Sequence, residues 1–130
     1  MDCRHPVSYG SCMQAVATRQ RTQPPPTWVV FEDLANPGRA TGRSWLHLLD
    51  DETPPHVLAA QRPTLVVWSS IWTKRLDANI QFDLAGSGSE TALRWTLLVE
   101  PPAPDDRLFR HMCQRIGELI NAGLRYTYGH

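Results

Sequence analysis

The longest regular pattern of apolar positions lies near the C-terminal end of the chain. Between residues 105 and 126, apolar side chains recur at steps of three and four: Leu108, Phe109, Met112, Cys113, Ile116, Leu119, Ile120 and Leu124. This spacing places them on one face of an α-helix. Asp105 or Asp106 can cap its first turn, and Gly129 follows its last turn. At ~1.5 Å per residue, such a helix can cross the full width of a small sheet.

Two segments before this helix alternate between apolar and polar residues with the period of a β-strand. Residues 78–85 place Ile80, Phe82 and Leu84 on one face, and residues 91–100 do the same with Leu93, Trp95, Leu97 and Val99. A glycine-rich turn at residues 86–89 joins them, so the pattern predicts a β-hairpin. On its other face, Asp83 and Arg94 can form an ion pair across the two strands.

Weaker patterns predict the remaining elements. Edge-strand alternation spans residues 12–21, and further strands are expected at residues 56–61 and 64–72. Between them, Trp28, Phe31, Leu34 and Ala35 have helical spacing, which predicts a helix at residues 26–35 that ends before Asn36-Pro37-Gly38. Residues 45–49 fit either a strand or a helical turn. The acidic residues Asp50, Asp51 and Glu52 are expected in a solvated turn, and residues 1–11, which carry no strong pattern, to be loosely ordered.

The order of these elements indicates the α+β class. The apolar face of the hairpin and the apolar stripe of the last helix have matching lengths, and each buried side chain stabilises the fold by about 1.5–3 kcal/mol. We therefore expect a curved antiparallel β-sheet wrapped around a long C-terminal helix. At 130 residues, the chain is expected to form a single domain over residues 1–130.

Residues 63–128 also resemble a known group of proteins, the SRPBCC superfamily, which includes START domains, plant pathogenesis-related allergens and polyketide cyclases. The similar segments are residues 66–70, 80–84, 91–97, 117–121 and 124–126, and they resemble segments of small actinobacterial members of the cyclase/dehydrase-like type. Residues 13–21, 24–26 and 31–34 resemble the first strand and first helix of the family, whereas residues 38–61 fit its pattern least well. The resemblance implies a START-like helix-grip fold with a cavity between the sheet and the last helix. The family has no shared catalytic residue to carry over.

Nine residues are candidates for the lining of this cavity. A tryptophan at such a site supplies a large apolar surface and one hydrogen-bond donor, although packing in the core explains the same residues. A serine hydroxyl can bind either a ligand or a backbone carbonyl. The candidates are Trp68, Ser70, Trp72, Phe82, Trp95, Met112, Ile116, Ile120 and Tyr126.

Composition and charge narrow the function classes. Lys and Arg together number 13, as do Asp and Glu, so no general attraction to nucleic acid is expected. The cysteines are Cys3, Cys12 and Cys113, an odd number without a CxxC pair, which fits neither a disulfide framework nor a thiolate zinc site. We expect no metal and no cofactor. The N-terminus lacks the apolar segment of a signal peptide, and no apolar run approaches the ~20 residues of a membrane span. We therefore expect a cytoplasmic protein without membrane insertion.

Three functions remain open at this point. The leading interpretation is a non-enzymatic binder or carrier of a small hydrophobic or amphipathic molecule, lipid-like or polyketide-like, in a monomer or homodimer. The second is a cyclase or dehydratase that uses the same cavity, which requires an acid or base pointing into it. The third is a protein-interaction module with a filled core and an exposed apolar patch. The identity of the ligand does not follow from the sequence.

Overall fold

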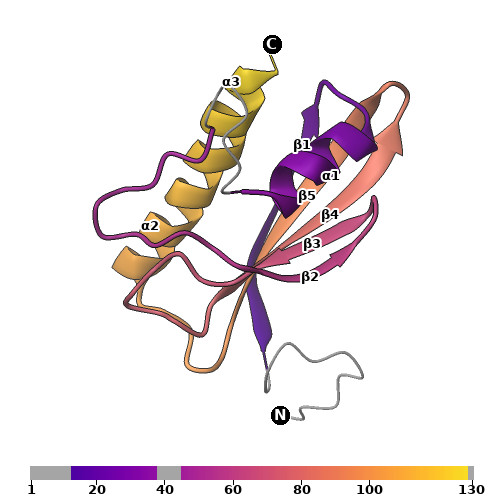
Figure 1. Ribbon diagram of the computed structural model, residues 1–130. Helices are drawn as coiled ribbons and strands as arrows, with labels where there is room; N and C mark the ends of the chain where they lie inside the picture. Colours follow the sequence, from indigo (N-terminus) through magenta and orange to yellow (C-terminus); the bar gives the residue numbers. More distant parts are fainter. Residues whose placement is uncertain (1–12, 38–44, 129–130) are drawn as a thin grey trace.

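A sheet and a long C-terminal helix form the two layers of the molecule. The computed structural model describes residues 13–37 and 45–128, so the expectation for residues 1–11 and the proposed helix stops at Gly38 and Gly129 lie outside the described residues. The elements, in chain order, are β1 (Gln14–Gln23), α1 (Thr27–Ala35), β2 (Val57–Gln61), β3 (Leu65–Trp68), β4 (Asn79–Ser87), β5 (Glu90–Val99), α2 (Asp106–Gly117), η1 (Glu118–Leu124) and α3 (Arg125–Thr127). Figure 1 shows α2 to α3 as one continuous helical rod beside the curved sheet. The α+β helix-grip class expected from the sequence is confirmed.

The sheet has five antiparallel strands in the order β1-β5-β4-β3-β2. The predicted hairpin is confirmed as β4 and β5, with Phe82 opposite Trp95. Gly88 occupies the turn with a φ of +64°, a conformation that glycine adopts without a steric penalty. Asp83 lies opposite Arg94, and their charged atoms are 3.8 Å apart, so the predicted ion pair is confirmed.

The C-terminal helix begins where the sequence predicted. Asp105 is its N-cap, and the carboxylate accepts a hydrogen bond of 2.8 Å from the backbone N–H of Leu108. The helical rod continues to Thr127, but its middle section η1 is a π-helix, which the apolar periodicity did not predict. Its buried face carries Met112, Ile116, Leu119, Ile120 and Leu124.

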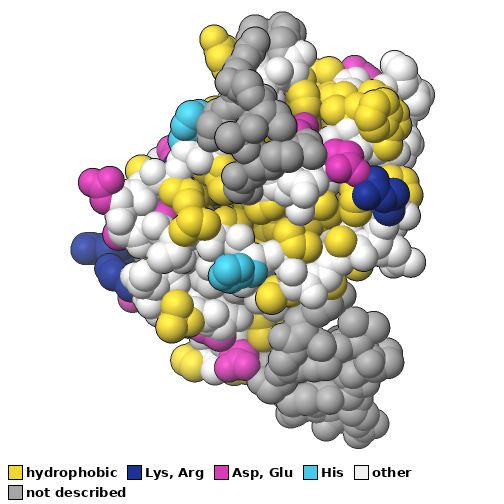
Figure 2. All heavy atoms as spheres, viewed as in Figure 1, with side chains coloured by type: hydrophobic (Ala, Val, Ile, Leu, Met, Phe, Trp, Pro, Cys, Tyr) yellow, Lys and Arg dark blue, Asp and Glu magenta, His cyan; other side chains and the backbone are white. Residues whose placement is uncertain are grey.

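The first helix, α1, lies next to the end of this rod. Its buried residues are Val30, Phe31 and Leu34, whereas Trp28 is 62% exposed. Trp28 therefore does not belong to the buried stripe to which its spacing assigned it. Figure 2 shows apolar side chains gathered on the molecular surface over α1.

Three predictions for the middle of the chain were wrong. The strand expected at residues 64–72 ends at Trp68, because the Ser70 hydroxyl bonds to both the backbone N–H and the carbonyl of Trp72 and closes a local turn. In the acidic turn, Asp50 and Asp51 are exposed, but the Glu52 side chain is only 1% exposed, because it pairs with Arg115 on α2. Residues 45–49 form neither a strand nor a helix.

Candidate ligand-binding site

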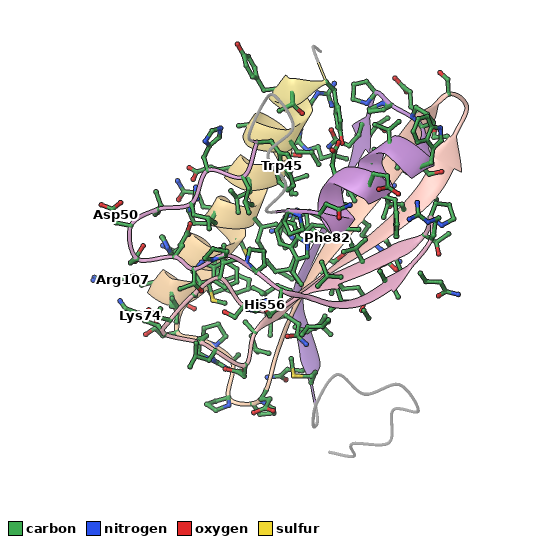
Figure 3. The ribbon with its side chains drawn as sticks, viewed as in Figure 1. Trp45, Asp50, His56, Lys74, Phe82 and Arg107 are labelled. Carbon is green, nitrogen blue, oxygen red and sulfur yellow. The ribbon has the colours of Figure 1, made fainter. Side chains whose placement is uncertain are left out.

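Six of the nine candidate residues lie in the core between the helix and the sheet. Trp68, Phe82, Met112, Ile116, Ile120 and Trp95 are all at most 4% exposed. The Trp68 ring stacks on Trp45 with centroids 5.9 Å apart and meets Phe82 edge-on at 4.8 Å. Figure 3 shows Trp45 and Phe82 in this space between the helical rod and the sheet. None of the six lines any of the three pockets described below.

The remaining three candidates line three different pockets. Trp72 lines a pocket of about 350 Å³ at the N-terminal end of α2. Tyr126, which is 64% exposed, lines a second pocket of about 460 Å³ beside η1. Ser70 lines a third pocket of about 440 Å³ with Pro54, His56 and Leu76. The nine residues therefore do not converge on one of these pockets.

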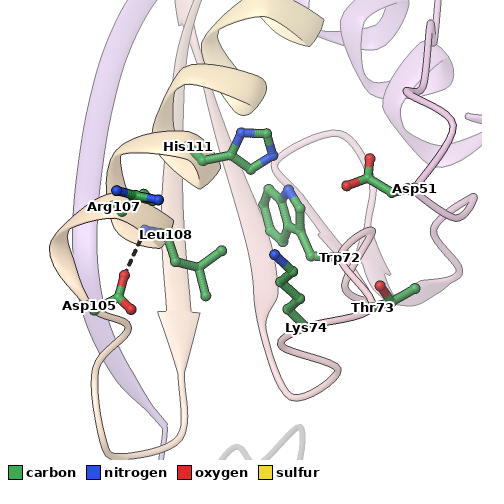
Figure 4. Close-up of a pocket in the computed structure, with 8 residues that line it drawn as sticks. All are labelled: Asp51, Trp72, Thr73, Lys74, Asp105, Arg107, Leu108 and His111. Carbon is green, nitrogen blue, oxygen red and sulfur yellow. Dashed lines mark hydrogen bonds between the residues drawn. The ribbon is translucent and has the colours of Figure 1, made fainter.

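The pocket around Trp72 brings together side chains from three separate parts of the chain. The first turns of α2 supply one wall, the segment after β3 supplies another, and Asp51 comes from the loop before β2. In Figure 4, the indole ring of Trp72 lies between the side chains of His111, Lys74 and Asp51. The lining residues are Asp51, Trp72, Thr73, Lys74, Asp105, Arg107, Leu108 and His111. We call this the Trp72 pocket.

Hydrogen bonds fix the backbone of Trp72, whereas the indole N–H of its side chain has no hydrogen-bond partner in the described residues. Ser70 Oγ accepts a hydrogen bond from Trp72 N at 2.9 Å and donates one to Trp72 O at 3.1 Å, and the backbone of Trp72 pairs with Glu52. The residue is 4% exposed, and its Nε1–H has no hydrogen-bond partner among the described residues. A buried donor without a partner costs about 1–3 kcal/mol. Ser70 therefore positions Trp72, whose buried indole N–H has no acceptor among the described residues.

Arg75 connects two walls of the Trp72 pocket. Its guanidinium binds both carboxylate oxygens of Asp77, at 2.9 and 2.8 Å, and donates to the carbonyls of Glu100 at 2.7 Å and Pro102 at 2.9 Å. The hydrogen bonds from Arg75 hold the pKa of Asp77 below its ordinary value, although burial acts in the opposite direction. The segment that carries Thr73 and Lys74 is thereby tied to the linker that leads into α2.

A buried ion pair lies at the pocket beside η1, where Arg115 is one of the lining residues. Arg115 donates to Glu52 through Nε at 2.8 Å and through Nη2 at 2.9 Å, and it also binds Glu118 and the His47 carbonyl. Burial alone raises the pKa of Glu52, but hydrogen bonds from Arg115 and from the Leu49 backbone, together with the charge of Arg115, lower it below its ordinary value. The hydrogen bond to Glu52 raises the pKa of Arg115. This pair fixes the loop before β2 against the helix.

The sequence contained a signal for this ion pair that the prediction did not use. Arg115 lies three residues after Met112 and four before Leu119, which puts a charge inside the apolar stripe of the helix. A charge in that position needs a buried partner. Lys74, Asp51 and His111 carried no such signal, because nothing in the local spacing relates these three residues to one another.

The Trp72 pocket offers an apolar surface with polar groups at its border. Trp72 and Leu108 supply the apolar wall, Lys74 and Arg107 carry cationic side chains, Asp51 carries a carboxylate, and His111 adds an imidazole ring. Within residues 13–37 and 45–128, no group of three or more His, Cys, Asp or Glu side chains is placed to hold a metal ion. In the same residues, no helix is long and apolar enough to span a membrane.

Comparison with known proteins identifies the fold but no family. No protein-family model matches the chain, and no curated protein matches it. Among solved structures, it is similar to the crystal structure of CalU16 from Micromonospora echinospora, a structural genomics target. The match has a TM-score of 0.53 at 13% sequence identity and covers 92% of this chain and 83% of CalU16. At this identity the likeness concerns the fold alone, and the chain has a helix-grip fold of the kind seen in CalU16.

Proposed function

We propose that this protein binds a small amphipathic molecule in the Trp72 pocket, where the N-terminal end of α2 approaches the sheet. The single observation that carries the proposal is Trp72, which lines a pocket of about 350 Å³ and whose buried indole N–H has no hydrogen-bond partner in the described residues. A ligand that accepts this hydrogen bond relieves the cost of the unpaired donor, so binding is favoured where that donor lies.

The walls of the pocket support an amphipathic ligand over a purely apolar one. Trp72 and Leu108 provide apolar area, and the residues around them are polar or charged. Ligand pockets of this kind combine a mostly apolar lining with a few polar groups that orient the ligand. The Arg75 network keeps two walls in place before binding, which reduces the entropy that the ligand must offset.

The test uses the indole signals of the tryptophans in ¹⁵N-labelled protein, after native mass spectrometry has screened for co-purifying molecules. A panel of aromatic and aliphatic amphiphiles is added, and Trp72→Phe identifies the Trp72 signal. We expect a ligand from the panel to shift that signal, and Trp72→Phe to weaken its binding about ten-fold, as the loss of one hydrogen bond implies. Because Trp72 Nε1 has no partner in the described residues, phenylalanine removes no internal hydrogen bond.

Trp95→Phe is the matched control. Trp95 is also 4% exposed with an unpartnered Nε1, but it lies on β5 and does not line the Trp72 pocket. Its variant should bind the ligand as the wild type does. Equal affinity of the wild type and Trp72→Phe would contradict the proposal. Binding of no compound would favour the alternative function, a protein-interaction module. The exposed apolar residues Val57 and Leu58 on the uncharged edge strand β2 would then be the candidate surface.

A further inference from the structure

Lys74 is the only lysine of the chain; since Lys and Arg together number 13, the other 12 basic side chains are arginines. This single ammonium group lines the Trp72 pocket and forms no ion pair among the described residues. Figure 4 shows its side chain extending toward the Trp72 ring. Its neighbour Arg75, in contrast, is fully engaged with Asp77 and two backbone carbonyls. A lysine is a compact, strongly hydrated point charge, and it interacts with an anion without the fixed fork geometry of arginine.

The other polar groups of the pocket make it richer in donors than in acceptors. Asp105 is committed to capping α2, because its carboxylate accepts the hydrogen bond from Leu108 N at 2.8 Å. Asp51 is therefore the one lining carboxylate without a hydrogen bond or ion pair in the described part of the chain. The lining cations, the ammonium of Lys74 and the guanidinium of Arg107, outnumber this carboxylate. This balance favours a ligand with an acceptor that carries negative charge.

We infer that the Trp72 pocket holds an amphipathic acid with its carboxylate at the Lys74 ammonium and its apolar body against Leu108 and the Trp72 ring. The inference rests on the proposed function and adds the chemical class of the ligand. Arg107 and the positive N-terminal end of α2 contribute longer-range attraction. Asp51 opposes the anion across the pocket, so its removal should strengthen binding.

The experiment compares three probes with the same ring system: naphthalene-2-carboxylate, the neutral 2-naphthamide and the cationic 2-naphthylmethylammonium. Lysine labelled with ¹³C at Cε gives a single side-chain signal in this protein, since there is one lysine. We expect the carboxylate to bind most tightly and to shift the Lys74 signal more than the amide does. Lys74→Gln should weaken carboxylate binding about ten-fold and leave amide binding within about two-fold. Asp51→Asn should strengthen carboxylate binding.

Arg110→Gln is the control for a general change of charge, because Arg110 is an exposed residue of α2 that does not line the pocket. It should change the carboxylate affinity far less than Lys74→Gln does. Tighter binding of the cationic probe, or a carboxylate affinity unaffected by Lys74→Gln, would overturn the inference. If all three probes bind equally and Trp72→Phe weakens each of them, the inference fails and the proposed function stands. If none binds, both fail.

Discussion

A single pair of side chains, Glu52 and Arg115, determines how the loop before β2 meets the C-terminal helix. Their side chains are 1% and 8% exposed, so both charges have lost most of their water. Removing a charge from water costs several kcal/mol unless its hydrogen-bonding positions are filled. Here the carboxylate receives two bonds from Arg115 and one from Leu49 N, while Arg115 also binds Glu118 and the His47 carbonyl. The geometry meets the condition under which a buried ion pair is tolerated.

We expect Glu52→Ala to lower the free energy of unfolding by about 3–5 kcal/mol, because it leaves the Arg115 charge buried without its main partner. Asp51→Ala, which removes the exposed carboxylate next to it, should change that free energy by less than about 0.5 kcal/mol. Urea denaturation of the three proteins at pH 7 measures both values. Similar losses in the two variants would contradict the role assigned to Glu52.

The same pair predicts a pH dependence with a definite sign. Because the folded protein holds the pKa of Glu52 below its ordinary value, this carboxylate adds stability above about pH 4.3, the pKa of an unperturbed glutamate. That contribution is lost as the pH falls toward the folded-state pKa. The stability difference between wild type and Glu52→Ala should therefore shrink between pH 5 and the acid limit of folding, and a difference independent of pH would be inconsistent with the pairing.

At the scale of elements, the hairpin and the C-terminal helix could be predicted because their patterns are local. The alternation along residues 78–85 and 91–100 and the three- and four-residue spacing after residue 105 each identify one face without reference to any other element. The segment from residue 64 to 72 illustrates the opposite case. Its residue types favour a strand throughout, but the Ser70 hydroxyl offers the Trp72 backbone other bonds, and β3 ends at Trp68.

The π-helical section η1 also depends on contacts that local spacing does not contain. Gly123 lies against the backbone of Trp45, where an added Cβ would be 2.6 Å from the Trp45 carbonyl oxygen. The chain at Trp45 can approach the helix this closely only because residue 123 has no side chain. Gly117, one and a half turns earlier in the same rod, has no such neighbour, and its nearest contact would be Asn121 Nδ2 at 3.9 Å.

These two glycines form a matched pair. Gly117→Ala should raise the free energy of unfolding by about 0.5–1 kcal/mol, since alanine is the better helix former and the site has space. Gly123→Ala should lower it by about 1–3 kcal/mol, because either the helix or the Trp45 backbone must move. Thermal and urea denaturation give the sign of each change. Stabilisation by both substitutions would mean that Trp45 does not pack against η1 in solution.

At the scale of the whole molecule, the site is harder to predict than the fold because distant segments build it. The Trp72 pocket combines residues from position 51 to position 111, and their convergence depends on the Glu52–Arg115 pair and on the Arg75 network. The resemblance to the SRPBCC superfamily predicted a cavity between the sheet and the last helix. In the structure, Trp68, Phe82 and Ile116 belong to the hydrophobic core that fills this space. Trp72 was a candidate because of its residue type, whereas Lys74 was not a candidate.

The far end of the grip is closed by contacts that join the two ends of the described chain. Arg125 donates to the carbonyl of Thr22 on β1 at 2.7 Å, and the Tyr128 hydroxyl donates to Asp33 on α1 at 2.8 Å. The second contact spans 95 residues of sequence. The C-terminal helix is therefore attached to the first strand and the first helix at one end, while the Trp72 pocket lies at the other.

We expect the hydroxyl of Tyr128 to stabilise the fold by about 1–2 kcal/mol, so Tyr128→Phe should lower the free energy of unfolding by that amount at pH 7. Burial, followed by the charge of Asp33 and the hydrogen bond to it, raises the pKa of Tyr128 in the folded protein. The contribution is therefore complete below the unfolded-state pKa of about 10 and is lost as the pH rises above it. The difference in the free energy of unfolding between wild type and Tyr128→Phe should be constant from pH 7 to 9 and decrease toward pH 11.

In an Asp33→Asn background, Tyr128→Phe should lower the free energy of unfolding by less, because the two groups act as a pair. A cost that is unchanged by Asp33→Asn and by alkaline pH would show that Tyr128 stabilises the protein through the packing of its ring rather than through this contact between the helices.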